Sequence, residues 1–149
     1  MKLVTVFGAS GRMGQAQVRQ LLLAGYQVRA ITRKKGVFKD ENVTEVSADY
    51  NDPESLDNAI EGADAAFYNK PSFEQVTKMI DFCAAVGAAA ARADVRLIYQ
   101  TAAYAPDDEI GQYNYDRVLA TERALKQGGA RTTIFTVSYT HLRAHETSR

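Results

Sequence analysis

The 149-residue chain has little of what builds disulfide frameworks, metal sites or strongly charged surfaces. It contains one cysteine, two histidines and no tryptophan, and its 18 basic side chains balance its 18 acidic ones. A single cysteine excludes a disulfide within the chain and any site built on several cysteines. Cys83 lies on the apolar face of its helix and is expected in the protein core. A neutral charge balance argues against a nucleic-acid partner, which a clustered basic face would attract. We therefore expect neither a metal site nor a nucleic-acid interface.

Long hydrophobic runs are also missing. The first apolar stretch, residues 3–7, ends at a glycine and is too short for a signal peptide or a membrane span. The overall composition, 46% hydrophobic and 24% charged residues, is ordinary for a globular protein. We expect one soluble, cytoplasmic domain that has no membrane partner.

Short β-branched and apolar runs alternate along the chain with segments of helical periodicity. Four helices are expected. The first begins at Arg12 and ends before Gly25, and the second begins at Pro53 with Asp52 as its cap. The third contains the alanine-rich stretch, and the fourth covers residues 114–127. This alternation predicts an α/β fold in which right-handed crossovers build a doubly wound parallel sheet, covered by helices on both faces. One such domain is expected over residues 1–136. Its six strands are expected at residues 3–7, 27–32, 43–48, 63–68, 96–100 and 132–137.

The segment GASGRMG, residues 8–14, lies where the first strand meets the first helix. In that context Gly8 permits a tight turn, Gly11 lets a pyrophosphate approach the backbone, and Gly14 allows close helix packing. The free N–H groups at the helix start would face the phosphates. The alternative is a glycine turn that binds no ligand. The loop residues predicted to bind a dinucleotide are Gly8, Ser10, Gly11, Arg12, Met13 and Gly14.

The end of the second strand bears on which dinucleotide is bound. Enzymes that use NAD usually place a carboxylate there for the ribose 2′-hydroxyl, whereas an arginine accommodates the 2′-phosphate of NADP. This chain has Arg33 followed by two lysines and no carboxylate before Asp40. Arg33, with Arg12 on the other side, would grip the phosphate through charge-assisted hydrogen bonds. We therefore predict NADP(H) in preference to NAD(H), the alternative being a solvated basic turn.

Together with the glycine loop, several segments carry a resemblance to a known family. They are VRAITRK, SADYNDPESLDNAIEGADAAF, PSFEQVTKMIDFCAAVGAA, RLIYQTAAYAP and ATERALKQGGARTTIF, which cover nearly the whole chain up to Phe135. The chain resembles the atypical short-chain dehydrogenase/reductase superfamily, especially its NmrA-like NAD(P)-binding branch. The resemblance implies that Asp49 and Tyr50 lie near the adenine. Tyr68, Asn69, Lys70 and Pro71 would border the nicotinamide-side ribose, although Lys70 equally fits a solvated loop charge. The fold implied is a Rossmann domain over residues 1–136 with strand order 3-2-1-4-5-6.

The catalytic pattern of carbonyl-reducing members is incomplete here. Those enzymes pair a tyrosine with a lysine four residues later, which lowers the phenol pKa, and add a serine or threonine after the fifth strand. Thr101 stands at the position of the hydroxyl residue, and Tyr113 precedes Arg117 by four residues. An arginine supplies charge but does not share a proton as a lysine does. Thr101 and Tyr113 are the catalytic candidates, the alternative being aromatic residues that edge the cofactor cleft.

Residues 137–149 do not fit the resemblance. The run from Val137 to Thr147 resembles the translation of a common transposase-based sequencing adapter, and such segments should be excluded from fold reasoning. We expect a non-native, disordered tail in which His141 and His145 have no function. The Rossmann domain would then be truncated before its substrate-binding part, and this fragment would itself be inactive.

Two functions compete for the intact protein. The first is an NADP(H)-dependent oxidoreductase that acts on a small carbonyl or quinone substrate. The second is a non-catalytic NADP(H)-sensing regulator that acts through a protein partner. A relative of sugar-nucleotide epimerases is a third interpretation, disfavoured because the tyrosine–lysine pair is absent.

Overall fold

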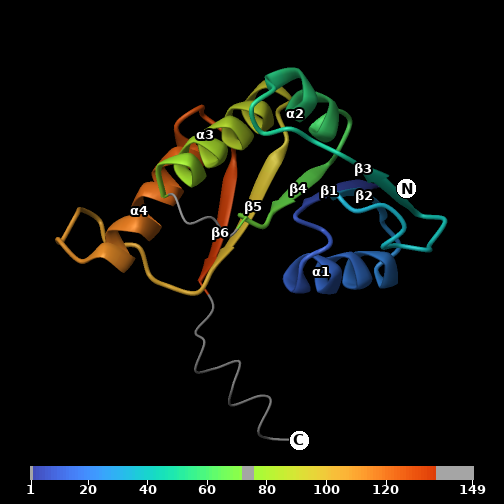
Figure 1. The fold of residues 1–149 in the computed structure, drawn as a ribbon, viewed down its shortest axis with the longest axis horizontal. Helices are drawn as coiled ribbons and strands as arrows, with labels where there is room; N and C mark the ends of the chain where they lie inside the picture. The colour runs from blue at the N-terminus through green and yellow to red at the C-terminus, as the bar shows by residue number, and fades with distance from the viewer. Residues whose placement is uncertain (1, 72–75, 137–149) are drawn as a thin grey trace, which may run out of the picture.

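The computed structural model describes residues 2–71 and 76–136, which form one six-stranded sheet flanked by helices (Figure 1). Neighbouring strands all pair in parallel, in the order β3-β2-β1-β4-β5-β6. The predicted α/β class and strand order are thus confirmed. The strands are β1 Leu3–Phe7, β2 Gln27–Ile31, β3 Val43–Val46, β4 Ala65–Tyr68, β5 Arg96–Thr101 and β6 Thr132–Thr136.

Four helices connect these strands within the described residues. Helix α1 packs on one face of the sheet, whereas α2, α3 and α4 pack on the other (Figure 1). Between β2 and β3 the chain makes a loop instead of a helix. The helices are α1 Arg12–Leu23, α2 Pro53–Ile60, α3 Val76–Arg92 and α4 Tyr113–Lys126.

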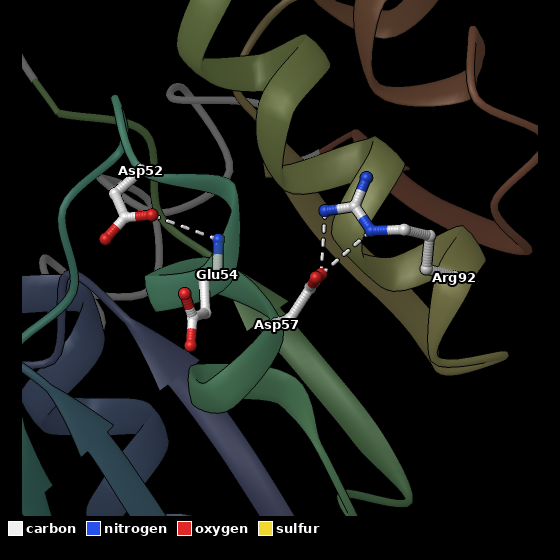
Figure 2. Close-up of polar contacts among 4 residues, drawn as sticks. All are labelled: Asp52, Glu54, Asp57 and Arg92. Carbon is white, nitrogen blue, oxygen red and sulfur yellow. Dashed lines mark hydrogen bonds and ion pairs between the residues drawn. The ribbon is translucent and has the colours of Figure 1, made fainter.

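The start of α2 follows from its local sequence. The Asp52 carboxylate accepts a hydrogen bond from the backbone N–H of Glu54 at 3.1 Å, and Pro53 occupies the first helical position (Figure 2). Further along, Arg92 of α3 donates to one Asp57 oxygen from Nε at 2.9 Å and from Nη2 at 2.7 Å (Figure 2). Both side chains are about half exposed, so this contact orients α3 on α2 more than it stabilises the fold.

The core is divided between the two faces. Under α2, α3 and α4 the largest buried side chains include Phe7, Leu56, Tyr68 and Leu97. The smaller cluster under α1 is built on Val4, Val6, Ala9, Val18, Val28 and Ala30. Since side chains alternate along a strand, each strand of the centre contributes to both clusters. Cys83 is fully buried in the larger cluster, in agreement with its predicted core position.

Cover of the sheet by helices is unequal in the described residues. In the part of the chain that the structure describes, α1 is the one helix on its face, and it packs on β1 and β2. At the other edge Ile134 points into the larger cluster, so Phe135 points to the α1 face and stays 49% exposed. Cover on both faces is therefore confirmed at the centre of the sheet, whereas at β6 the described residues place no helix on the α1 face.

Residues 137–149, the predicted non-native tail, lie outside the described residues, so the domain boundary at residue 136 stays a prediction. Within residues 2–71 and 76–136, every helix is too short or too polar to cross a membrane.

Candidate functional site

A cleft of about 780 Å³ opens at the carboxyl ends of β1, β2, β3 and β4. It lies where the strand order reverses, because β1 has β2 on one side and β4 on the other. Open parallel sheets bind ligands at this switch point, and the cleft has the size of a ligand site. All ten predicted cofactor residues line it: Gly8, Ser10, Gly11, Arg12, Met13, Gly14, Arg33, Asp49, Tyr50 and Asn69.

The glycine loop is shaped by close backbone contacts. Gly8 has φ +64°, and a Cβ there would lie 2.9 Å from the Asn69 carbonyl oxygen, so this glycine serves both the turn and the approach of the β4 loop. A Cβ on Gly14 would overlap the Gly8 carbonyl oxygen and stand 2.7 Å from Ala9 Cα. The loop backbone itself thus enforces glycine at position 14. At Gly11 the nearest atom to an added Cβ is the Gly8 oxygen at 3.3 Å.

The start of α1 faces the cleft without a capping side chain. Gly11 is the N-cap residue and has no side chain to offer, and the first turn carries no acidic residue. The loop is braced from within, since Gln15 Nε2 donates to the Ser10 carbonyl oxygen at 2.8 Å. The first backbone N–H groups of the helix and the positive end of its dipole are consequently available to an anion.

Arg33 lies on the exposed turn that follows β2. The preceding residue is anchored to β3, because the Thr32 N–H donates to the Val46 carbonyl oxygen at 3.0 Å. Arg33 lines the cleft together with Tyr50, and its positive charge opposes the rise in the pKa of Tyr50. Asp40, the next carboxylate along the chain, is held in a local turn, where it accepts from the Asn42 N–H at 2.8 Å. The cleft thus presents a cation at the end of β2.

Asp49 and Tyr50 follow β3 and form the wall opposite the glycine loop. Asp49 Oδ1 accepts from the Asn51 N–H at 2.9 Å, which fixes the turn. The Tyr50 ring stacks on Phe82 of α3, with centroids 4.8 Å apart and an interplanar angle of 14°. Burial raises the pKa of Tyr50 to about 12. The Tyr50 side of this wall is therefore an uncharged aromatic ring, and Phe82 of α3 packs against it.

Asn69 and Lys70 follow β4 at the other end of the cleft. The Asn69 amide donates to the Phe7 carbonyl oxygen at 2.9 Å and to Gln17 Oε1 at 2.7 Å, so it joins β1 and α1 to the β4 loop. Lys70 is half-buried, and its pKa is lowered first by burial and then by the charge of Arg117. The side chain of Lys70 lines the cleft, unlike a fully solvated loop lysine.

The two catalytic candidates lie apart from this cleft lining. Thr101 is only 8% exposed, and its hydroxyl pairs with the backbone of Ala103 at 3.3–3.4 Å. Tyr113 is 65% exposed at the start of α4, with the Arg117 guanidinium 5.7 Å from its ring centroid. The buried Arg117 Nε has no hydrogen-bond partner among the described residues. Neither Thr101 nor Tyr113 is among the residues that line the cleft, and their catalytic roles stay predictions.

The sequence analysis did not predict two residues of α3 that line the cleft. Lys78 and Phe82 border the cleft, with Lys78 Nζ 5.9 Å from the Phe82 ring centroid. Phe82 belongs to the apolar side of its helix, and its sequence neighbourhood contains no motif that distinguishes it from a core residue. Within the described ranges no three histidine, cysteine or acidic side chains gather into a potential metal site.

Comparison with known proteins agrees with this geometry. Residues 1–144 match the model of the NmrA-like family. Citrobacter sp. triphenylmethane reductase complexed with NADP(H) is similar over 97% of this chain and 55% of its own, with 30% identity and a TM-score of 0.74. The Bordetella bronchiseptica enzyme WbmH in complex with NAD+ is similar over 93% and 56%, with 21% identity and a TM-score of 0.74.

Vestitone reductase from alfalfa, 21% identical, aligns with a TM-score of 0.70 over 92% of this chain and 56% of its own. The chain thus spans little more than half the length of these three structures. The two at 21% identity share the fold alone, whereas the family match extends over almost every residue of this sequence. With a Rossmann-type sheet, a glycine loop at its switch point and this match, the chain belongs to the NmrA-like family.

Proposed function

We propose that the cleft binds a nicotinamide dinucleotide, that it prefers NADP(H), and that the intact protein is an NADP(H)-dependent oxidoreductase of a small carbonyl or quinone substrate. One observation carries the proposal: the uncapped start of α1 and the cation Arg33 face the same cleft. A pyrophosphate would bind at the free N–H groups of the helix start, and a 2′-phosphate would bind to Arg33.

The residues present fit such a ligand. Gly11 is exposed and adds no side chain between a phosphate and the first N–H groups of α1. Arg33 would hold the 2′-phosphate, Tyr50 would border the adenine, and Asn69 with Lys70 would border the nicotinamide-side ribose. When bound, the reduced cofactor supplies a hydride to an electron-poor carbon. The chain's own residues bind it, orient it and exclude water from one face.

The preference for NADP(H) rests on charge at the end of β2. A carboxylate next to Arg33 would repel a 2′-phosphate, but Asp40 is engaged with a backbone N–H and does not line the cleft. The solved neighbours support dinucleotide binding in general, because one is complexed with NADP(H) and another with NAD+.

Binding measurements on Arg33→Ala test the proposal. We expect the wild-type chain to bind NADPH more tightly than NADH by fluorescence titration, and the substitution to weaken NADPH binding about tenfold, the loss of roughly one charge-assisted pair. NADH affinity should change less than twofold. Arg19→Ala, on the exposed outer side of α1, is the matched loss of charge and should leave both affinities unchanged. Equal affinities for the two cofactors would overturn the preference, and binding of neither would overturn the site.

A regulator that senses NADP(H) without turnover is the second candidate, favoured by the position of Tyr113. Its hydroxyl-bearing ring is exposed and pairs with Arg117 where reductases have a lysine. A regulator would act through a protein partner, whereas a reductase needs only its small-molecule substrate. Oxidation of NADPH across a panel of quinones and aldehydes separates the two. Binding of NADPH by the intact protein without turnover of any substrate would favour the regulator.

A further inference from the structure

We propose that Glu45 is a positioning residue for cofactor selectivity, because its carboxylate holds the backbone of the basic turn in the shape that receives a 2′-phosphate. The inference rests on the proposed preference for NADP(H) and deepens it. Glu45 lies in β3, outside the cleft lining, and no glycine motif or strand-end rule singles it out.

Both carboxylate oxygens of Glu45 are used on the backbone of the turn. The Gly36 N–H donates to Oε2 at 2.6 Å, and the Phe38 N–H donates to Oε1 at 2.8 Å. These contacts lower the pKa of Glu45, with the Phe38 hydrogen bond the largest cause and the Gly36 hydrogen bond the next. Such bonds to an ionised acceptor are short and strong. One side chain therefore fixes two points of a loop that has no helix to hold it.

The other end of the turn is anchored to the same strand and to Ser47 just beyond it. Thr32 donates its N–H to Val46, and the Ser47 hydroxyl donates to the Thr32 carbonyl oxygen at 3.4 Å. The Thr32 hydroxyl in turn accepts from the Lys34 N–H at 3.1 Å. The exposed residues between these anchors are Arg33, Lys34 and Lys35. The basic residues are thus carried on a short loop with both ends attached to β3 and its extension.

Glu45 keeps its own negative charge, but among the described residues it does not hold any cationic side chain of the turn in an ion pair. A free carboxylate beside an arginine and two lysines would pair with one of them and cancel part of their attraction for a phosphate. In the described ranges Glu45 forms no ion pair; those present join Arg92 to Asp57, Arg123 to Asp108 and Arg131 to Asp94. Because both oxygens accept from backbone N–H groups, the turn is held without loss of a cation.

Removal of Glu45 should therefore change the affinity for NADPH in the direction opposite to the one expected from its charge alone. Loss of a negative charge near a phosphate site would by itself strengthen NADPH binding. Loss of the two backbone contacts frees the turn, so that the 2′-phosphate must order it on binding, at a cost in conformational entropy. NADH has no 2′-phosphate and does not use the turn. A selective fall in NADPH affinity would therefore identify positioning, and a rise would identify charge alone.

The experiment compares the wild-type chain, Glu45→Ala, Glu45→Gln and Glu41→Ala. Dissociation constants are measured for NADPH and NADH by fluorescence, and for 2′,5′-ADP and 5′-AMP by calorimetry, since the last two ligands differ only in the 2′-phosphate. We expect Glu45→Ala to weaken NADPH and 2′,5′-ADP about tenfold and the other two ligands less than twofold. Glu45→Gln keeps one acceptor and should fall between. Glu41→Ala removes an exposed charge of the same loop and should leave the affinity ratio unchanged or raise it.

Amide hydrogen exchange supplies a readout independent of the cofactor. The Gly36 and Phe38 amides should exchange faster in Glu45→Ala, whereas amides of β1 should not change. An equal loss of NADPH and NADH affinity, or unchanged affinities, would overturn the inference. If the wild-type chain prefers NADPH and Arg33→Ala removes that preference while Glu45→Ala does not, only the inference fails. If the wild-type chain has no preference, the proposed function fails with it.

Discussion

Two glycines of the loop have different roles, although they are the same residue type. Gly14 is enforced by the backbone of Gly8 and Ala9, which leaves no room for a side chain. At Gly11 an added Cβ would meet one atom, the Gly8 carbonyl oxygen at 3.3 Å, and the residue lines the cleft, so its lack of a side chain matters to a ligand more than to the fold. One position is thus structural and the other belongs to binding, although both read as the same motif in the sequence.

Alanine at each position should separate these jobs. Gly14→Ala forces the loop and α1 apart and should cost at least the 1–3 kcal/mol typical of an overpacked site, so both the melting temperature and dinucleotide affinity should fall. Gly11→Ala should keep a melting temperature near that of the wild type and lose affinity. Thermal unfolding and NADPH titration on both variants check this. Identical stability of the two variants would contradict the distinction.

Among the elements, α3 and α4 pack closely against each other at Gly87. A Cβ on Gly87 would overlap the carbonyl oxygen of Leu125 and stand 2.9 Å from its carbonyl carbon. The sequence offers no reason for a glycine inside a long alanine-rich helix, because the reason is the backbone of another helix. The same holds for Phe82, which only the packing of α3 brings to the cleft.

The substitution Gly87→Ala therefore sets helix propensity against packing. Propensity alone favours alanine by about 1 kcal/mol, whereas the clash with α4 should cost more than that, so we expect a net loss of stability. Urea unfolding measures the sign. Ala91→Gly in the same helix is the control, and it should cost about 1 kcal/mol from propensity. A Gly87→Ala chain more stable than the wild type would show that the two helices separate without cost.

For the whole molecule, local patterns were enough to predict the order of elements, the parallel sheet and seven of the ten lining residues, whereas the family resemblance implied Asp49, Tyr50 and Asn69. Strand ends and glycine spacing are local signals, and parallel crossovers have one handedness, so the parallel sheet follows. Contacts between distant segments were not predictable in this way. The Glu45 carboxylate on the Gly36 N–H and the half-exposed Phe135 on β6 both depend on which element lies beside which. The sequence therefore reveals the candidate site through its motif, whereas the contacts that support the site are found only in the structure.

The buried tyrosines predict how the whole molecule responds to alkali. Burial raises the pKa of both Tyr50 and Tyr99 from 10.0 to about 12, and it also raises the pKa of Tyr68. Because the folded state keeps these protons where the unfolded chain releases them, their contribution to stability is complete below pH 10. It is lost as the pH rises from 10 toward 12, by roughly 1.4 kcal/mol per pH unit for each tyrosine.

Urea unfolding at pH 9, 10, 11 and 11.5 measures this slope. Tyr99→Phe and Tyr50→Phe should each make the alkaline loss shallower, because phenylalanine has no proton to release from the unfolded chain. Tyr104→Phe is the matched control, since its ring is 63% exposed and its loss should leave the slope unchanged. If Tyr104→Phe flattened the curve as much as Tyr99→Phe, burial in the sheet core would not be the cause. The slope belongs to the fold as a whole, since Tyr50, Tyr68 and Tyr99 come from three segments that only the packed sheet brings together.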